Sequence, residues 1–197
     1  MRSLLAAISK CAACARFLPH GVRPVIAASP RSRIAIIGQA PGRKVHASGV
    51  PWQDQSGDTL RAWLGVTADE FYNADQFALV PMGFCYPGTG TTGDLPPRPE
   101  CAPLWHDRLF ALMPEIQLTL LIGQYSQARY LGENAADSLT ENVRAFRDHL
   151  PRYLPLPHPS PRNRIWQSRN PWFEKDLLPV LKATVTRVLR SSLNGRP

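Results

Sequence analysis

The hydrophobic positions of this chain form four short apolar runs, separated by segments with helical spacing or loop residues. The runs cover residues 33–38, 76–82, 118–123 and 153–156. Short unbroken runs rich in Ile, Leu and Val are typical of strands that are buried on both faces of a parallel sheet. They predict a central, mostly parallel sheet of four strands.

Apolar residues at helical spacing predict helices around this sheet. The predicted helices cover residues 1–18, 57–64, 100–113 and 142–150, and others begin at Thr67, near Ser126 and at Pro171. Thr67 opens a capping-box pattern, and Pro179 should kink the C-terminal helix. The remaining long segments, residues 38–56 and 83–99, are predicted to be loops, and the last few residues to be frayed. Strands that alternate with helices predict an α/β fold.

Three segments rich in Gly or Pro directly follow predicted strands, at residues 38–42, 83–93 and 158–163. Ligands of parallel α/β sheets bind at the carboxyl ends of the strands. A long loop inside a compact domain is usually functional. We therefore expect these three segments to meet at one edge of the sheet and to form the functional site there.

The length, hydrophobic content and charge of the chain limit the classes of protein to which it can belong. The 197 residues suit one domain, and a hydrophobic content of 44% allows a real core. Lys and Arg number 23 against 15 Asp and Glu, a net charge of +8. This surplus favours a polyanionic partner, although a merely soluble basic protein would also show it. No apolar run approaches the roughly 20 residues that cross a bilayer, and the N-terminus is not a signal peptide. We therefore expect a cytoplasmic protein that does not enter membranes.

Two motifs, one after the first predicted strand and one after the last, indicate a more specific class of protein. Residues 38–42 (GQAPG) are followed by residues 49–52 (GVPW) and 54–57 (DQSG), and residues 156–161 read LPHPSP. GQAPG alone indicates no more than a βα turn. Taken together and in this order, the motifs resemble the two signature motifs of the uracil-DNA glycosylase superfamily. The resemblance implies a single domain over residues 1–197, folded as a three-layer αβα sandwich. It also implies that the partner is DNA with a damaged base, bound by a monomer.

The chain has four cysteines, Cys11 and Cys14 in a Cys-x-x-Cys pattern and Cys85 and Cys101 in and after the loop 83–99. In a cytoplasmic protein such cysteines indicate a metal or redox role before disulfides. Their arrangement resembles the iron-sulfur branch of the superfamily. The resemblance implies that the four thiolates hold a structural [4Fe-4S] cluster, the first pair from the N-terminal helix. Zinc is the alternative cofactor, and four unrelated buried thiols are the alternative to any cofactor.

The resemblance also assigns roles in catalysis. An enzyme that acts on a base must flip it out of the stack and hold it in a pocket. His158 would donate a hydrogen bond to the departing base, and Trp52 stands where the superfamily has an aromatic ring that stacks on the base. The floor of the pocket would come from the first motif, namely Gly38, Ala40, Pro41 and Gly42. Ser160 would bind phosphate. Of the residues that follow, Arg162 would fill the gap left by the flipped base and Arg164 would bind phosphate, with Asn163 between them on the same DNA-binding loop.

Two positions depart from the superfamily pattern. Gln39 stands where the iron-sulfur branch has Glu, and an amide can hydrogen-bond in the catalytic site but cannot act as a base. We therefore expect Asp54 to orient water or to stabilise the sugar cation, with an Asx turn or helix cap as the alternative role. The second strand ends in Val80 and Pro81 instead of an Asn that reads the uracil edge. The prediction is a DNA glycosylase that hydrolyses the N-glycosidic bond of a deaminated base, uracil first, with hypoxanthine or xanthine as alternatives. A non-catalytic protein that binds damaged DNA is the other hypothesis.

Overall fold

The computed structural model describes residues 1–91 and 93–191. The predicted fraying concerns the last few residues, which lie outside the described residues.

A four-stranded parallel sheet forms the centre of the fold. Its strands are β1 (Ile34–Ile37), β2 (Phe77–Leu79), β5 (Leu118–Ile122) and β6 (Tyr153–Leu156). They run in the order β2-β1-β5-β6, and every neighbouring pair is parallel. The four apolar runs of the sequence are thus confirmed as strands, with each end within three residues of its predicted place. Because the strands are buried on both faces, apolar residues at every position are what this sheet requires.

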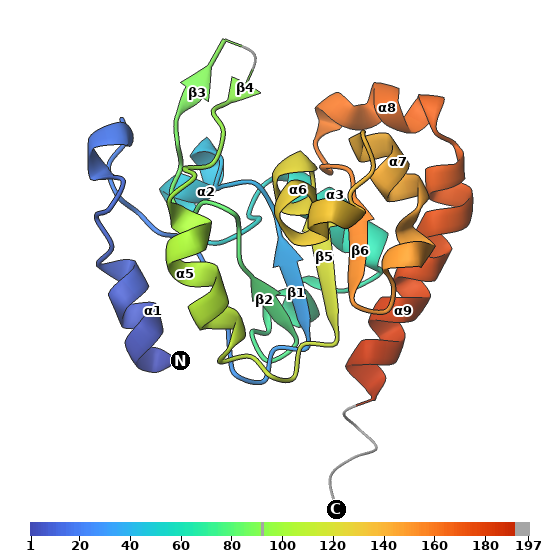
Figure 1. Cartoon of the computed structure of the whole chain (residues 1–197), viewed down its shortest axis with the longest axis horizontal. Coiled ribbons are helices and arrows are strands. Elements are labelled where there is room, and N and C mark those ends of the chain that lie inside the picture. Colours follow the sequence, from blue (N-terminus) through green and yellow to red (C-terminus); the bar gives the residue numbers. More distant parts are fainter. Residues whose placement is uncertain (92, 192–197) are drawn as a thin grey trace, which may run out of the picture.

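Helices cover both faces of the sheet, which confirms the predicted three-layer arrangement (Figure 1). The helices are α1 (Arg2–Ser9), α2 (Arg43–Ser48), α3 (Gln55–Leu64), α4 (Ala68–Tyr72), α5 (Cys101–Phe110), α6 (Gln124–Leu131), α7 (Leu139–Arg144), α8 (Arg164–Arg169) and α9 (Leu178–Arg190). On one face, Ile34 and Ile36 pack with α3, α4, α7 and α9. On the other face, Ala35 packs with α1 and α5. Alternate residues of one strand therefore enter two different cores.

Shorter elements connect these helices. They are η1 (Ala15–Phe17), η2 (Gly132–Asn134), η3 (Phe146–His149), η4 (Pro161–Asn163) and the π-helical η5 (Phe173–Leu177), which precedes Pro179 and leads into α9. The capping box at Thr67 is confirmed, because its side chain accepts from Glu70 N and the Glu70 side chain accepts from Thr67 N.

Several predicted boundaries are wrong. The N-terminal helix ends at Ser9 instead of residue 18, so Cys11 and Cys14 lie in the turns after it and not on it. The predicted loop 38–56 contains α2. The predicted loop 83–99 contains the hairpin of β3 (Thr89–Gly90) and β4 (Gly93–Asp94). The helix predicted over 142–150 is α7 followed by η3, and α8 was not predicted. All of these are short elements, whose stability comes from packing more than from local pattern.

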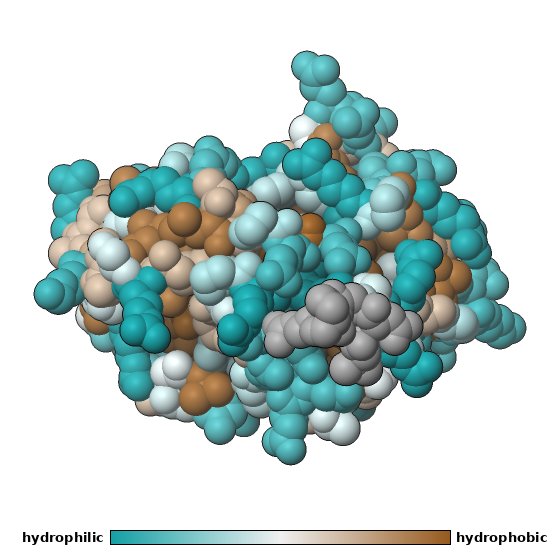
Figure 2. Space-filling model, turned by 90° about the horizontal axis from the view of Figure 1, so that it is seen from below, coloured by the Kyte–Doolittle hydropathy of each residue, from teal (hydrophilic) through white to brown (hydrophobic). Residues whose placement is uncertain are grey.

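The two edges of the sheet differ. At the carboxyl ends of the strands, Figure 1 shows α2, the β3–β4 hairpin, α6 and α8 close together. Figure 2 shows the opposite edge, which is largely hydrophilic, with apolar side chains gathered mainly toward the side that carries α1. The helices and the hairpin that follow the four strands therefore lie at the carboxyl edge, where such folds bind ligands.

Candidate active site

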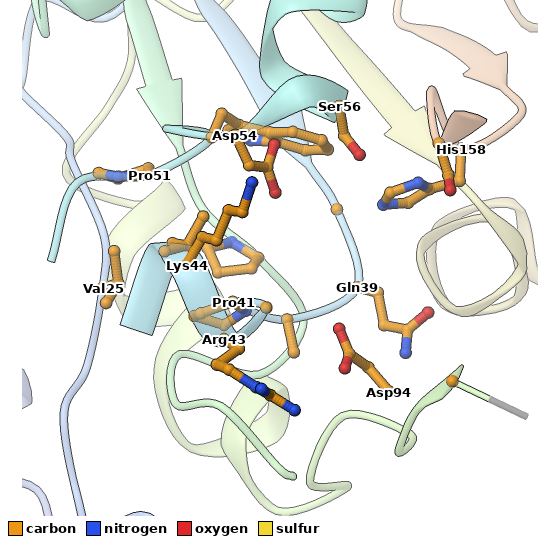
Figure 3. Close-up of a pocket in the computed structure, with 18 of the residues that line it drawn as sticks. Val25, Gln39, Pro41, Arg43, Lys44, Pro51, Asp54, Ser56, Asp94 and His158 are labelled. Carbon is orange, nitrogen blue, oxygen red and sulfur yellow. The ribbon is translucent and has the colours of Figure 1, made fainter. Parts of the chain in front are cut away.

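A cavity of about 410 Å³ opens at the carboxyl edge of the sheet. We call it the strand-end cavity. It is lined by residues from the loop after β1 and from α2, from the turn before α3, from the β3–β4 hairpin and from the loop after β6. The three predicted segments therefore do meet at one site. Figure 3 shows how the side chains that face this space come from parts of the chain far apart in sequence.

The loop after β1 is fixed to its surroundings by its backbone. The carbonyl oxygens of Gly38 and Gln39 accept hydrogen bonds from Met82 N (2.8 Å) and Gly83 N (3.0 Å). The Gln39 side chain donates from Nε2 to the Leu95 carbonyl (3.1 Å) at the foot of the hairpin. All five residues of this motif line the cavity, namely Gly38, Gln39, Ala40, Pro41 and Gly42.

Trp52 is held in a left-handed backbone conformation, with φ at 58°. Such a residue costs of order 1–3 kcal/mol and persists only where its surroundings fix it. Here the Trp52 carbonyl accepts a hydrogen bond from the Tyr72 hydroxyl (3.3 Å). A Cβ on Gly57 would overlap the same carbonyl oxygen, and a Cβ on Gly38 would lie 2.7 Å from the indole ring. Both glycines are therefore required for Trp52 to present its ring to the cavity.

The Asp54 side chain caps a helix and also lies at the wall of the cavity. Its side chain caps α3, because Oδ1 accepts a hydrogen bond from Gly57 N (2.9 Å). The residue also lines the cavity. The helix-cap role that the sequence left as an alternative is thus present in the structure, together with access to the cavity.

His158 is half-buried at the cavity wall, and its ring centroid lies 5.8 Å from that of Trp52. Burial lowers the pKa of His158, against the smaller opposing effects of the Asp54 and Asp94 carboxylates. The imidazole is therefore neutral at pH 7 and keeps one N–H to donate. Asn163 Nδ2 donates to the His158 carbonyl (2.7 Å) and fixes the loop that carries this ring.

The other predicted DNA-binding residues divide into two groups. Ser160 and Arg162 line the cavity, and Ser160 Oγ accepts a hydrogen bond from Arg162 N (3.3 Å). The Arg162 guanidinium packs against the hairpin, since a Cβ on Gly93 would lie 2.6 Å from Nη1. Asn163 and Arg164 do not line the cavity. Arg164 is exposed at the start of α8, whereas Asn163 supports the His158 loop.

Sequence reasoning missed several residues of the cavity wall. Among them are Arg43 and Lys44 of α2, Ser56 of α3, and Thr89 and Asp94 of the hairpin. The signal for Asp94 was present, because the loop that contains it was expected to be functional. Without the hairpin, however, no sequence pattern places Asp94 beside the first motif.

The four cysteines surround a second, much smaller cavity of about 20 Å³, which we call the cysteine cavity. Its other walls include Leu18, Phe84, Arg98 and Trp105. Burial is the main cause that raises the pKa of Cys14, of Cys85 and of Cys101, the last to about 12. Phe84 N donates a hydrogen bond to Cys101 Sγ (3.3 Å).

In residues 1–91 and 93–191, no three His, Cys, Asp or Glu side chains lie close enough together to hold a single metal ion. The structure thus brings all four predicted cysteines to one cavity, but it does not arrange them around one ion. Over the same residues, no helix has the length and apolar character needed to span a membrane.

Comparison with known families agrees with the fold. Residues 26–182 match the sequence profile of the Uracil DNA glycosylase superfamily. The match covers most of the chain, so the protein belongs to this superfamily. Membership gives it a DNA glycosylase-type function in general, that of a hydrolase with DNA as its substrate.

Proposed function

We propose that this protein excises a deaminated base, uracil first, by hydrolysing its N-glycosidic bond to the deoxyribose in DNA. The observation that carries the proposal is the meeting of a neutral His158, the Trp52 ring and the Asp54 carboxylate at one cavity. Its volume of about 410 Å³ lies in the range of small-molecule sites, so a flipped base can enter. The net charge of +8 favours the DNA backbone.

The residues divide the chemistry between them. Trp52 stacks on the flipped base and holds its plane next to His158. As the C1′–N bond breaks, negative charge develops on the base, and the imidazole N–H of His158 stabilises it by a hydrogen bond. Asp54 orients water or stabilises the positive charge that develops on the sugar. Ser160 binds a phosphate that flanks the flipped nucleotide, and Arg162, at the same wall of the cavity, fills the gap that the flipped base leaves in the duplex.

The specificity remains open among bases that share a lactam edge, because Val80 and Pro81 occupy the end of β2. Hypoxanthine and xanthine are the alternative substrates. A non-catalytic role in binding damaged DNA is the second candidate function. The observation that favours it is Gln39, a neutral amide bound to the Leu95 carbonyl, in a motif that carries an acid in the iron-sulfur branch.

An activity panel tests the proposal. Oligonucleotides with one uracil, hypoxanthine or xanthine, in single and double strands, are incubated with excess protein and then cleaved with alkali at abasic sites. We expect strand cleavage at uracil, and much slower cleavage with His158→Ala. Damage-dependent binding without any abasic site would establish the non-catalytic function instead.

We further propose that Cys11, Cys14, Cys85 and Cys101 hold a structural [4Fe-4S] cluster, with zinc as the alternative. All four cysteines of the chain line one cavity, in apolar surroundings that include Phe84 and Trp105. A [4Fe-4S] cluster takes one thiolate on each of its four irons, and the four cysteines supply that number of ligands. When bound, the group would cross-link the turns after α1 to the loop after β2 and to α5. Iron and acid-labile sulfide analysis with visible absorbance tests this, and zinc without iron would overturn it.

A further inference from the structure

The β3–β4 hairpin brings a second carboxylate, Asp94, to the strand-end cavity. Asp94 Oδ1 accepts a hydrogen bond from Thr89 Oγ1 (3.4 Å), directly across the hairpin. Thr89 Oγ1 in turn hydrogen-bonds with the Tyr86 hydroxyl. Tyr86 is only 1% exposed, and His20 stacks on its ring at a centroid distance of 5.1 Å. A short hydrogen-bonded chain therefore connects Asp94 to a buried aromatic anchor.

The other oxygen of Asp94 faces the first motif. A Cβ on Gly42 would lie 3.2 Å from Asp94 Oδ2, so this oxygen sits directly over the GQAPG loop. Figure 3 shows Asp94 next to Gln39, with Asp54 on the far side of the cavity and His158 beyond Gln39. The Asp94 charge also acts on the His158 ring. Asp94 thus shares the cavity with the residues assigned to base excision.

The two carboxylates of the strand-end cavity, Asp54 and Asp94, differ in their exposure to solvent. Asp54 is half-buried and has one oxygen occupied by the cap of α3, whereas Asp94 is exposed at the mouth of the cavity. A flipped base enters a pocket first and its sugar stays at the mouth. The water that attacks C1′ must therefore be held at the mouth. Gln39, beside Asp94, cannot take a proton from that water because a carboxamide is not a base at pH 7.

We propose that Asp94 is the carboxylate that accepts the proton of the attacking water, which leaves Asp54 to stabilise the sugar cation. In this step the water oxygen forms a bond to C1′ while the C1′–N bond breaks and its electron pair leaves with the base. One water proton passes to Asp94, and the His158 N–H hydrogen-bonds to the base anion. The inference rests on the proposed function and names a further catalytic residue for it.

Single-turnover kinetics on the best substrate of the panel test the inference. Asp94→Asn should slow excision at least ~100-fold, the usual size of a general-base contribution. Its affinity for the same duplex, measured by fluorescence anisotropy, should stay within threefold of the parent protein. Asp176→Asn, an exposed carboxylate on η5 outside the cavity, is the matched control and should excise at the parent rate.

Chemical rescue separates a catalytic role from a structural one. Asp94→Ala leaves space at the mouth, so added formate should restore part of the excision rate, whereas Asp54→Ala should not respond. Thr89→Val, which removes the hydrogen bond to Asp94, should fall between Asp94→Asn and the parent. An Asp94→Asn rate within threefold of the parent would overturn the inference. An Asp94→Ala protein that is slow and whose excision rate formate does not raise would also overturn the inference. A parent protein without activity on any base would instead reject the proposed function.

Discussion

The strand-end cavity and the cysteine cavity border the same segment after β2, yet their side chains are held in different ways. In the strand-end cavity, backbone contacts fix each wall: Trp52 by Tyr72, the His158 loop by Asn163, and Gln39 by Leu95. In the cysteine cavity, Phe84 N donates a hydrogen bond to Cys101 Sγ (3.3 Å), and the Cys14 thiol donates a long one to the Glu100 carboxylate (3.8 Å). The first site is thus preorganised by hydrogen bonds within the protein, whereas our proposal for the second is that a group bound to the thiols stabilises it.

The largest expected effect is the loss of folding stability when a cysteine of the cysteine cavity is replaced. Cys101→Ser should lower the free energy of unfolding by about 4 kcal/mol, the size of a lost metal site, because the cluster would lose one of its ligands. Denaturant unfolding of the parent and the variant measures this. The control is the parent protein stripped of iron, which should be no more stable than the variant. A loss below ~1 kcal/mol would mean that the cavity holds four ordinary thiols.

The second prediction removes the hydrogen-bond donor of the strand-end cavity. His158→Ala should slow excision roughly 100- to 1,000-fold, because the base anion loses its donor. Its thermal unfolding midpoint and its iron content should equal those of the parent, since the His158 loop is held by Asn163 and not by a residue of the cysteine cavity. His149→Ala, on η3 at the opposite edge of the sheet, is the control. If His158→Ala also lost iron, the separation of the two cavities would be wrong.

The third prediction concerns His106, which connects the two regions. His106 Nε2 bonds to the carbonyl of Pro81, a residue of the strand-end cavity, and its helix α5 begins at Cys101. Burial lowers the pKa of His106 from 6.5 to about 4. Between these pH values the unfolded chain binds more protons, so stability is complete above about pH 6.5 and falls as the pH decreases toward 4. The loss can reach about 3 kcal/mol.

Unfolding free energies of the parent and of His106→Gln, measured from pH 7 to pH 4, test this linkage. The parent should lose more stability than the variant over this interval, while His149→Gln should follow the parent. Parallel curves for the parent and His106→Gln would show that His106 does not contribute to the acid sensitivity.

The smallest expected effect comes from adding a single Cβ atom at Gly57, beside the turn that carries Trp52. Gly57→Ala should cost about 1–3 kcal/mol of stability, because the added Cβ overlaps the Trp52 carbonyl. Excision should slow as well, since relief of that overlap displaces the indole ring. Gln55→Ala, exposed on the same helix, should change neither quantity. Normal activity in Gly57→Ala would show that Trp52 has no role in holding the base.

Much of this arrangement could be predicted from the sequence, for identifiable reasons. The four strands were predicted because buried parallel strands leave unbroken apolar runs. The meeting of the GQAPG and HPSP segments followed from their places after β1 and β6. The sequence does not predict the place of Asp94, because each strand of its hairpin has only two residues, too few to form a detectable alternating pattern. The helix predicted over residues 1–18 was too long, because its apolar spacing continues past Ser9 although Cys11 and Cys14 pack in turns.

The crowding between Gly57 and the Trp52 carbonyl also limits how this pocket can be redesigned. The indole orientation, the cap of α3 and the turn between them form one interlocked unit, so an exchange of Trp52, Asp54 or Gly57 disturbs all three. The hairpin across the cavity is joined to the rest of the site mainly through side chains. A library meant to change base preference should therefore leave residues 52–57, Thr89 and Asp94 intact and randomise the other residues of the hairpin.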